Sequence, residues 1–176
     1  IAVGRELELD IKTIADGLAS FNGVHRRLEL KGTVSGVTVV DDYGHHPTEV
    51  MATLAAIRQV YQGRLIVTFQ PHRYTRTKAL FNEFVGAFAE ADFLILNDIY
   101  PASEAPIPGV SSAALAAAIK EKGQRCVEHI SGQEEIVEFL LKTVGPGDTV
   151  LTLGAGNIYK LGESLLNRLA AGKDKK

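Results

Sequence analysis

The chain alternates between two hydrophobic periods, and this alternation limits the possible folds more than any other feature. Short apolar β-type runs recur over residues 37–40, 64–69, 92–97, 125–129 and 148–154. Amphipathic helical patterns separate them, over residues 47–61, 77–91, 111–123 and 134–144, and a last one follows around 158–169. Strands that are apolar on both faces and alternate with amphipathic helices are typical of a parallel sheet covered by helices on both sides.

Two β-type runs within residues 26–42 meet at Ser35-Gly36, so we expect an antiparallel hairpin at the start of the sheet. The predicted fold is therefore α/β: a doubly wound, mostly parallel, six-stranded Rossmann-like sheet with an antiparallel N-terminal hairpin strand. Residues 1–20 hold two helical patterns that are too short to bury a face alone, which favours a helical layer shared with an upstream segment. We expect a boundary at Phe21-Asn22-Gly23 and a disordered tail over 173–176.

Charge and cysteine content exclude several classes of partner. The formal net charge is −2 and the Lys and Arg residues are scattered. The basic stripe that binds a nucleic-acid backbone is therefore missing, and we expect no nucleic-acid partner. The one cysteine, Cys126, can form neither an internal disulfide nor a multi-cysteine metal site, which favours a reducing cytoplasm.

The sequence also gives no reason to expect a membrane partner. No apolar stretch approaches the roughly 20 residues that a membrane span needs, and no signal-peptide pattern opens the chain. Because the chain starts at Ile1 without Met, we expect it to be a piece of a longer protein.

Acids, histidines, arginines and a glycine turn follow the ends of three predicted strands. The first strand is followed by 41–46 (DDYGHH), the second by 70–76 (QPHRYTR) and the third by 154–157 (GAGN). Plain loop residues lead into the opposite ends of the same strands. Since ligands of such sheets bind beyond the carboxyl ends of the strands, the sequence predicts one site where these three ends meet.

The histidines of the first segment have a structural alternative. His45 and His46 can simply open a helix with Pro47 at its first position, but the two acids beside them favour a function. Adjacent histidines rarely bind one ion and no His-x-x-x-His spacing occurs, so no metal site is predicted.

The second segment places His72, Arg73 and Arg76 at a predicted helix start, where the macrodipole disfavours cations. A bound carboxylate or phosphate would offset these charges, because arginine donates paired hydrogen bonds to such groups. The alternative is that they pair with local acids such as Asp42 or Glu49.

Two further segments keep their roles open. The turn at 154–157 could cradle a phosphate, but close packing of helix on strand explains its glycines equally well, and the chain lacks a G-x-x-x-x-G-K-[ST] phosphate loop. The long loop 98–109 carries Tyr100 and Glu104, for which a proline-stiffened connection is the favoured interpretation.

Four segments together resemble the C-terminal domain of the Mur ligases: FNGVHRRLELKG, DDYGHHPTEV, FQPHRYTRT and LTLGAGNI. The resemblance implies that residues 23–172 form that domain and that residues 1–22 are the last helices of a central ATP-binding domain. It also implies an ATP-dependent, amide-forming ligase of peptidoglycan precursor synthesis that acts through an acyl phosphate. Its substrates would be UDP-N-acetylmuramate and L-alanine, its Mg²⁺ would be held mainly by the central domain, and the fragment alone would be inactive.

The resemblance assigns roles to seven positions. The nucleotide contacts are Arg27, Asp42, Tyr43 and His45, with Asp42 receiving the ribose hydroxyls and His45 close to the phosphates. The catalytic cluster, which faces the transferred phosphoryl group and the amino acid's carboxylate, is His72, Arg73 and Arg76. Preorganised arginines in a closed crevice stabilise the negative charge of acyl-phosphate and tetrahedral species.

Three rival interpretations stay open. A murein-peptide recycling ligase, which attaches a tripeptide to UDP-N-acetylmuramate, has similar motifs but by the family pattern lacks the HRYTRT stretch. The second rival is a non-catalytic nucleotide-binding module, and the third is a purely structural domain whose charges at the strand ends cancel one another.

Overall fold

The computed structural model describes residues 1–21 and 23–172. Within these residues a six-stranded sheet has the order β1-β2-β6-β3-β4-β5. The strands are β1 (Glu29–Val34), β2 (Val37–Asp42), β3 (Leu65–Phe69), β4 (Phe93–Leu96), β5 (Val127–His129) and β6 (Thr149–Leu153). Asn22 of the expected boundary and the expected tail, 173–176, lie outside the described residues.

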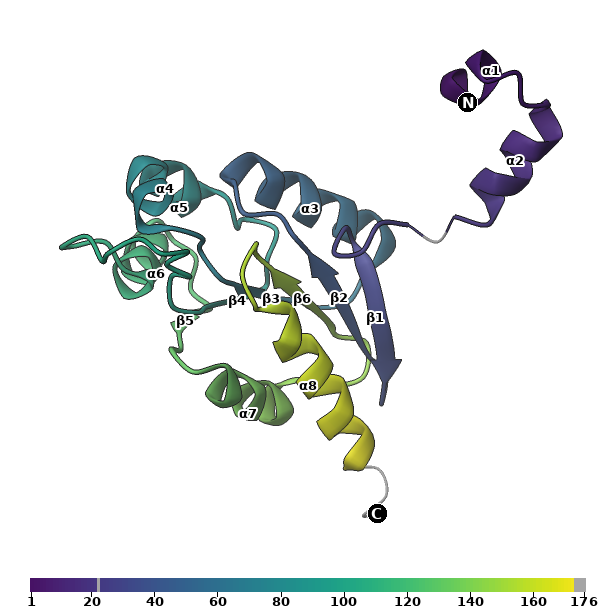
Figure 1. Ribbon diagram of the computed structural model, residues 1–176. Coiled ribbons are helices and arrows are strands. Elements are labelled where there is room, and N and C mark those ends of the chain that lie inside the picture. The colour runs from purple at the N-terminus through teal and green to yellow at the C-terminus, as the bar shows by residue number, and fades with distance from the viewer. Residues whose placement is uncertain (22, 173–176) are drawn as a thin grey trace.

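Helices cover both faces of the sheet (Figure 1). On one face lie α3 (Pro47–Val60), α4 (Tyr74–Ala79), α5 (Phe81–Gly86) and α6 (Ser112–Glu121). On the other lie α7 (Gln133–Thr143) and α8 (Tyr159–Ala171). Along the central strands, successive side chains point to opposite faces, so that Leu65 and Val67 join the α3–α6 core while Ile66 joins the α7–α8 core.

The strand pairing confirms the predicted fold. β1 pairs with β2 antiparallel, and every other pairing of the sheet in the described residues is parallel. The hairpin turns at Ser35 and Gly36, which have φ values of 54° and 78°. Two successive positive φ angles give a turn whose twist matches the two strands, and glycine adopts them without steric cost.

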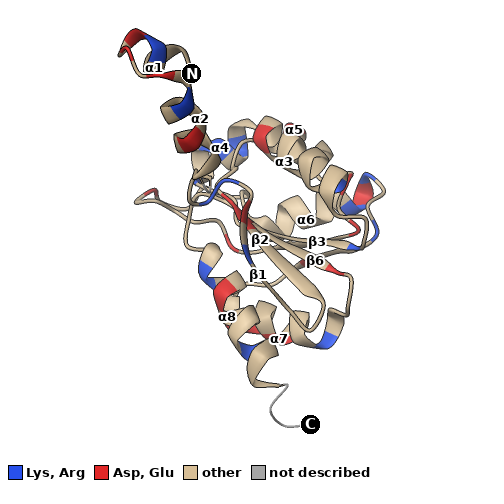
Figure 2. Cartoon of the chain, turned by 90° about the vertical axis from the view of Figure 1, so that its right-hand side faces the viewer, with Lys and Arg blue, Asp and Glu red and all other residues tan. Residues whose placement is uncertain are grey.

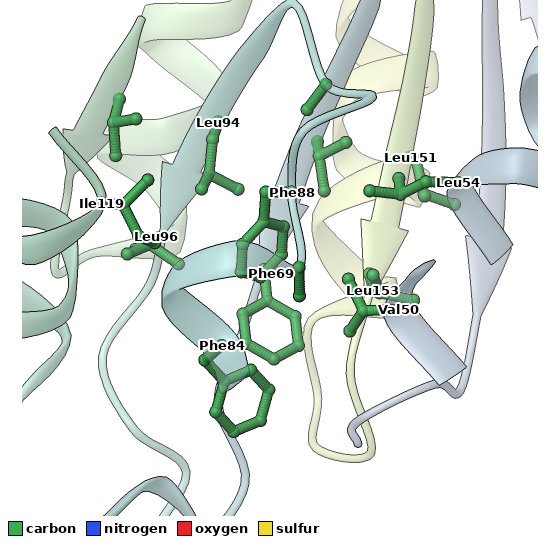
Figure 3. Close-up of a cluster of buried hydrophobic side chains, with 14 of the residues drawn as sticks. Val50, Leu54, Phe69, Phe84, Phe88, Leu94, Leu96, Ile119, Leu151 and Leu153 are labelled. Atoms are coloured by element: carbon green, nitrogen blue, oxygen red, sulfur yellow. The ribbon is translucent and has the colours of Figure 1, made fainter. Parts of the chain in front are cut away.

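The helix predicted over 77–91 is wrong as a single element. The chain becomes helical three residues earlier, at Tyr74, and breaks at Leu80, which has φ −111° and ψ 24°. The break lets α5 turn so that Phe84 and Phe88 pack against Phe69, with ring centroids 5.5 and 5.1 Å away. Figure 3 shows these three rings together in the core. Burial of two aromatic rings therefore overrides the continuous helical pattern.

The two N-terminal helices, α1 (Ala2–Glu6) and α2 (Ile11–Ala19), form where the sequence predicts them. They stand apart from the sheet in both Figure 1 and Figure 2, and only Ile14 of their residues is buried. Exposed apolar side chains in and beside these helices are Ile1, Val3, Leu7, Leu9, Ile11 and Leu18. No helix among the described residues has an apolar stretch long enough to span a membrane. Figure 2 shows basic and acidic residues interspersed along helices and loops.

Candidate functional site

The carboxyl ends of β2, β6 and β3 lie side by side, because β6 pairs with both of the other strands in parallel. The N–H of Gly154 donates to the carbonyl of Asp42 over 3.1 Å, and the N–H of Gln70 donates to the carbonyl of Leu153 over 3.0 Å. The predicted meeting of three strand ends is confirmed, and we call this edge of the sheet the rim.

Asp42 lies on the rim but its carboxylate turns inward, with 4% of the residue exposed. It accepts hydrogen bonds from the N–H of Leu28 (2.9 Å), the N–H of Gly44 (2.8 Å) and the hydroxyl of Thr53 (3.2 Å). These bonds order the loops on either side of β2. The contact of Asp42 with the ribose stays a prediction. Within the chain, Asp42 orders the loops that form the rim.

Three of the predicted nucleotide contacts form one continuous surface. The guanidinium of Arg27 lies 5.8 Å from the centroid of the Tyr43 ring, and that ring meets His45 edge to face at 5.4 Å. Tyr43 is 37% exposed, and Arg27 is exposed as well. An aromatic face beside a free guanidinium suits a planar base and an anion.

The two adjacent histidines have separate tasks. His46 is the N-cap of α3, with Pro47 at the first position and Glu49 closing a capping box, so the structural interpretation holds for His46. Burial tends to raise the pKa of Glu49, but hydrogen bonds from the N–H groups of His45 and His46 outweigh burial and lower it. The His45 ring instead lies on the rim, 5.7 Å from the ring of His72.

His72 and Arg76 lie beside His45, and Arg73 follows His72 in the chain. The His72 ring stacks on Tyr100 at 5.5 Å and 10°, and Arg76 Nη1 lies 3.4 Å from His72 Nδ1. Burial, followed by the charges of His45, Arg76 and Arg73, lowers the pKa of His72. His72 is therefore neutral at neutral pH and can accept the hydrogen bond from Arg76.

No carboxylate among the described residues forms an ion pair with Arg73 or Arg76. Pairing with Asp42 or Glu49 is wrong as an explanation, because Asp42 bonds to loop N–H groups and the Thr53 hydroxyl, and Glu49 bonds to N–H groups at the start of α3. Arg73 itself is the N-cap of α4 with a φ of 74°, a conformation that costs free energy for a residue with a Cβ. Arg76 on the rim is therefore available to an anion, and the exposed Arg73 beside it in the chain forms no ion pair, although its charge acts on the Glu104 carboxylate.

Loop 98–109 does more than connect two elements. The carbonyl of Tyr100 accepts the N–H of Arg73 over 2.8 Å, and Glu104 accepts both the N–H and the hydroxyl of Thr75, over 3.0 and 2.6 Å. Tyr100 and Glu104 thus hold the start of α4, a role that sequence reasoning missed. The unusual length of the loop was the available signal.

The glycines of the 154–157 turn are explained by packing. A Cβ on Gly154 would lie 2.7 Å from the carbonyl oxygen of Gln70, and one on Gly156 would lie 2.2 Å from Gln70 Oε1. Gln70 is held by its amide group, which donates to Asn97 Oδ1 over 3.0 Å and to Asn157 Oδ1 over 3.2 Å. Its Oε1 has no hydrogen-bond partner among the described residues.

Arg26 organises the rim, and sequence reasoning passed over it in favour of Arg27. Its Nε donates to the fully buried Asp41 over 3.0 Å, and its two terminal nitrogens donate to the carbonyls of Gly154 and Gly156. Burial raises the pKa of Asp41, while hydrogen bonds from Thr152 and Arg26 oppose the rise. Nothing in the spacing of two adjacent arginines distinguishes the inward one from the outward one.

Comparison with known proteins follows the same segments. The family model "Mur ligase, glutamate ligase domain" matches residues 26–156. The UDP-N-acetylmuramate–L-alanine ligase of Syntrophus aciditrophicus is 58% identical over 174 residues, which are 99% of this chain and 36% of that protein. The Geobacter sulfurreducens protein of the same name is 55% identical over 170 residues, or 96% of this chain and 37% of that one. The chain thus spans a little over a third of the length of the curated relatives it matches.

Solved structures agree on the fold. A UDP-N-acetylmuramate-alanine ligase from Thermotoga maritima matches with a TM-score of 0.80 at 23% identity, over 98% of this chain and 36% of that one. A murein peptide ligase from Psychrobacter arcticus matches with a TM-score of 0.68 at 22% identity, over 96% of this chain and 35% of that one. The matched family segment takes in the hairpin, the parallel strands and all three loops of the rim, and the chain belongs to the Mur ligase family.

Proposed function

We propose that this chain is the C-terminal domain of a cytoplasmic, ATP-dependent ligase that joins L-alanine to UDP-N-acetylmuramate in peptidoglycan precursor synthesis. The observation that carries the proposal is the placement of His72 and Arg76 beside His45 on the rim, with Arg73 next to His72 in the chain and neither arginine in an ion pair with a carboxylate of the described residues. Relatives more than 50% identical to the chain bear the name of that reaction.

The reaction needs a site for negative charge. The carboxylate of UDP-N-acetylmuramate attacks the terminal phosphorus of ATP, which releases ADP and leaves an acyl phosphate. The amino group of L-alanine then attacks the acyl carbon, loses a proton and expels phosphate, so that an amide bond forms. Arg73 and Arg76 stabilise the charge on the phosphoryl oxygens and bind the carboxylate of L-alanine. His72, neutral and hydrogen-bonded to Arg76, keeps that guanidinium in place.

The nucleotide lies against the other half of the rim. Arg27 contacts the nucleotide and the Tyr43 ring offers a flat face. His45, which lies between these groups and the arginine cluster, is close to the phosphates. Asp42 receives the ribose hydroxyls through Oδ2, which among the described residues accepts only the N–H of Leu28. The ligands of Mg²⁺ belong mainly to the central domain of the ligase.

Residues 1–22 belong to an upstream, ATP-binding domain, and residues 23–172 form the C-terminal domain. The exposed apolar side chains of α1 and α2 support this division, because such surface is stable only when it is covered. Closure of the two domains brings Arg73 and Arg76 onto the phosphoryl group and excludes water. This chain alone is therefore inactive.

The test is phosphate release by the full-length protein, measured with ATP, UDP-N-acetylmuramate and L-alanine. Arg73→Ala and Arg76→Ala each lower kcat/KM by about 10²- to 10³-fold, the loss typical of one preorganised charge donor. Arg125→Ala, an exposed arginine before β5, is the matched control and leaves turnover unchanged. Full activity in both rim variants would remove the arginines from the mechanism. Turnover with the tripeptide but not with L-alanine would assign the protein to the recycling reaction instead.

A further inference from the structure

We infer that Arg26 is a positioning residue of the nucleotide site: it fixes the Gly154–Asn157 turn and the Tyr43 ring so that Arg27 faces the bound nucleotide. That a nucleotide binds here rests on the proposed function. That Arg26 holds the Gly154–Asn157 turn rests on contacts within the chain. Arg26 itself does not touch the nucleotide.

The Arg26 side chain joins two separate segments of the rim. It forms an ion pair with Asp41 at the end of β2 and donates to the carbonyls of Gly154 and Gly156 after β6. Only 12% of the side chain is exposed, and all three of its nitrogen positions are engaged. Three of the five N–H donors of the guanidinium are therefore used inside the protein, and its small exposed fraction favours an internal role.

Two aromatic rings enclose the same guanidinium. Its carbon lies 5.0 Å from the centroid of Tyr43 and 4.7 Å from that of Tyr159, distances at which a cation attracts a ring face. The Tyr43 ring thus has Arg26 within reach as well as Arg27 and His45. Without the Arg26 side chain, the Tyr43 ring, which the nucleotide is proposed to contact, would lose one of the groups that hold it.

The backbone explains why two adjacent arginines point in different directions. Arg26 and Leu28 have φ values of 58° and 45°, which are costly for residues with large side chains. Hydrogen bonds hold this conformation: the N–H of Arg26 donates to Glu29, the N–H of Leu28 to Asp42, and the N–H of Tyr43 to the carbonyl of Arg26. In the kinked segment the Arg26 side chain is 12% exposed, whereas Arg27 is exposed.

Lysine cannot replace Arg26, although it keeps the charge that buried Asp41 requires. A lysine ammonium lacks the planar fork that serves one carboxylate and two carbonyls at once, and it stacks less well between rings. Arg26→Lys is therefore the variant of choice, because it loosens the turn without leaving Asp41 unpaired.

Arg58→Lys is the matched control. Arg58 also donates to one carboxylate and two backbone carbonyls, those of Asp92, Glu90 and Gly63, but at the opposite ends of the strands. The two variants lose the same kinds of hydrogen bond, so Arg58→Lys shows what the loss of such bonds away from the rim does to the KM for ATP.

Two readouts separate positioning from stability. In the full-length ligase, Arg26→Lys raises the KM for ATP about tenfold and changes kcat less than about threefold, whereas Arg58→Lys changes neither. In the present chain, Arg26→Lys speeds hydrogen exchange of the amides at 154–157 about tenfold, and Arg58→Lys does not.

An unchanged KM for ATP in Arg26→Lys, or an equal rise in both variants, overturns the inference. If Arg26→Lys does not fold, Tyr159→Leu removes one enclosing ring while keeping the ion pair. It then raises the KM about threefold, and no rise counts against the inference. Absence of any ATP-dependent reaction in the wild-type protein refutes the proposed function instead. In that case the hydrogen-exchange rates test whether Arg26 holds the turn. Unaltered exchange of the amides at 154–157 in Arg26→Lys refutes that role.

Discussion

Substitution of Gly156 by alanine tests the account of the rim at one atom. The new Cβ would lie 2.2 Å from Gln70 Oε1 and 2.9 Å from two ring atoms of Tyr100. Gln70 is only 5% exposed, so it can yield only by rotating its amide and giving up the hydrogen bonds to Asn97 and Asn157. At about 1 kcal/mol for each bond, and with the Tyr100 ring displaced from His72, Gly156→Ala lowers the free energy of unfolding by about 2–3 kcal/mol.

The assay is urea unfolding of the chain at pH 7, followed by circular dichroism. Gly145→Ala is the control, because no atom lies within 4 Å of the position that its Cβ would take. Neither glycine has a φ in the left-handed region, so backbone strain does not enter the comparison. We expect Gly145→Ala to stay within about 0.5 kcal/mol of wild type. A Gly156→Ala protein as stable as the control would refute the packing explanation of the turn.

Two further predictions concern titration. Arg76→Gln raises the pKa of His72 only part of the way toward its ordinary value, because burial is the largest cause of the lowered pKa and remains in the variant. NMR titration of His72 measures the change, and an unchanged pKa would contradict the prediction. A lowered histidine pKa supplies stability above pH 6.5 that is lost as the pH falls through the folded-state pKa. Burial tends to raise the pKa of Asp148, but hydrogen bonds from Arg64 and the N–H of Gly145 lower it overall. Asp148→Asn therefore lowers the free energy of unfolding by about 1 kcal/mol at pH 7, a modest value because Arg64 is partly exposed. In urea unfolding, this loss of stability shrinks below about pH 4. A loss that does not depend on pH would exclude the ion pair as its source.

Much of the fold follows from the sequence because its cause is local. Apolar runs of period two and helices of period 3.6 specify the layers, and the Ser35-Gly36 turn specifies the hairpin. The break at Leu80 does not follow, since it depends on how Phe84 and Phe88 reach Phe69 across the core. Tertiary packing therefore determines where this helix breaks, and no local stretch of the sequence carries that information.

The site shows the same division. Parallel strands bring their carboxyl ends to one edge, so His45, His72 and Arg76 were predictable as neighbours from their positions after strands. The direction of a side chain was not predictable where it depends on unusual backbone angles. Arg26 and Arg27 are adjacent and of the same type. With a φ of 58° at Arg26, the side chain of Arg26 is partly buried and that of Arg27 is exposed.

The place of β6 in the sheet has a consequence for how the protein is made. β6 comes last in the chain among the described strands, yet it lies between β2 and β3. Until residues 149–153 have left the ribosome, β1–β2 and β3–β4–β5 are two ribbons, each with an open edge of unpaired backbone groups. The domain therefore assembles late and all at once, around the strand that is synthesised after the rest of its sheet.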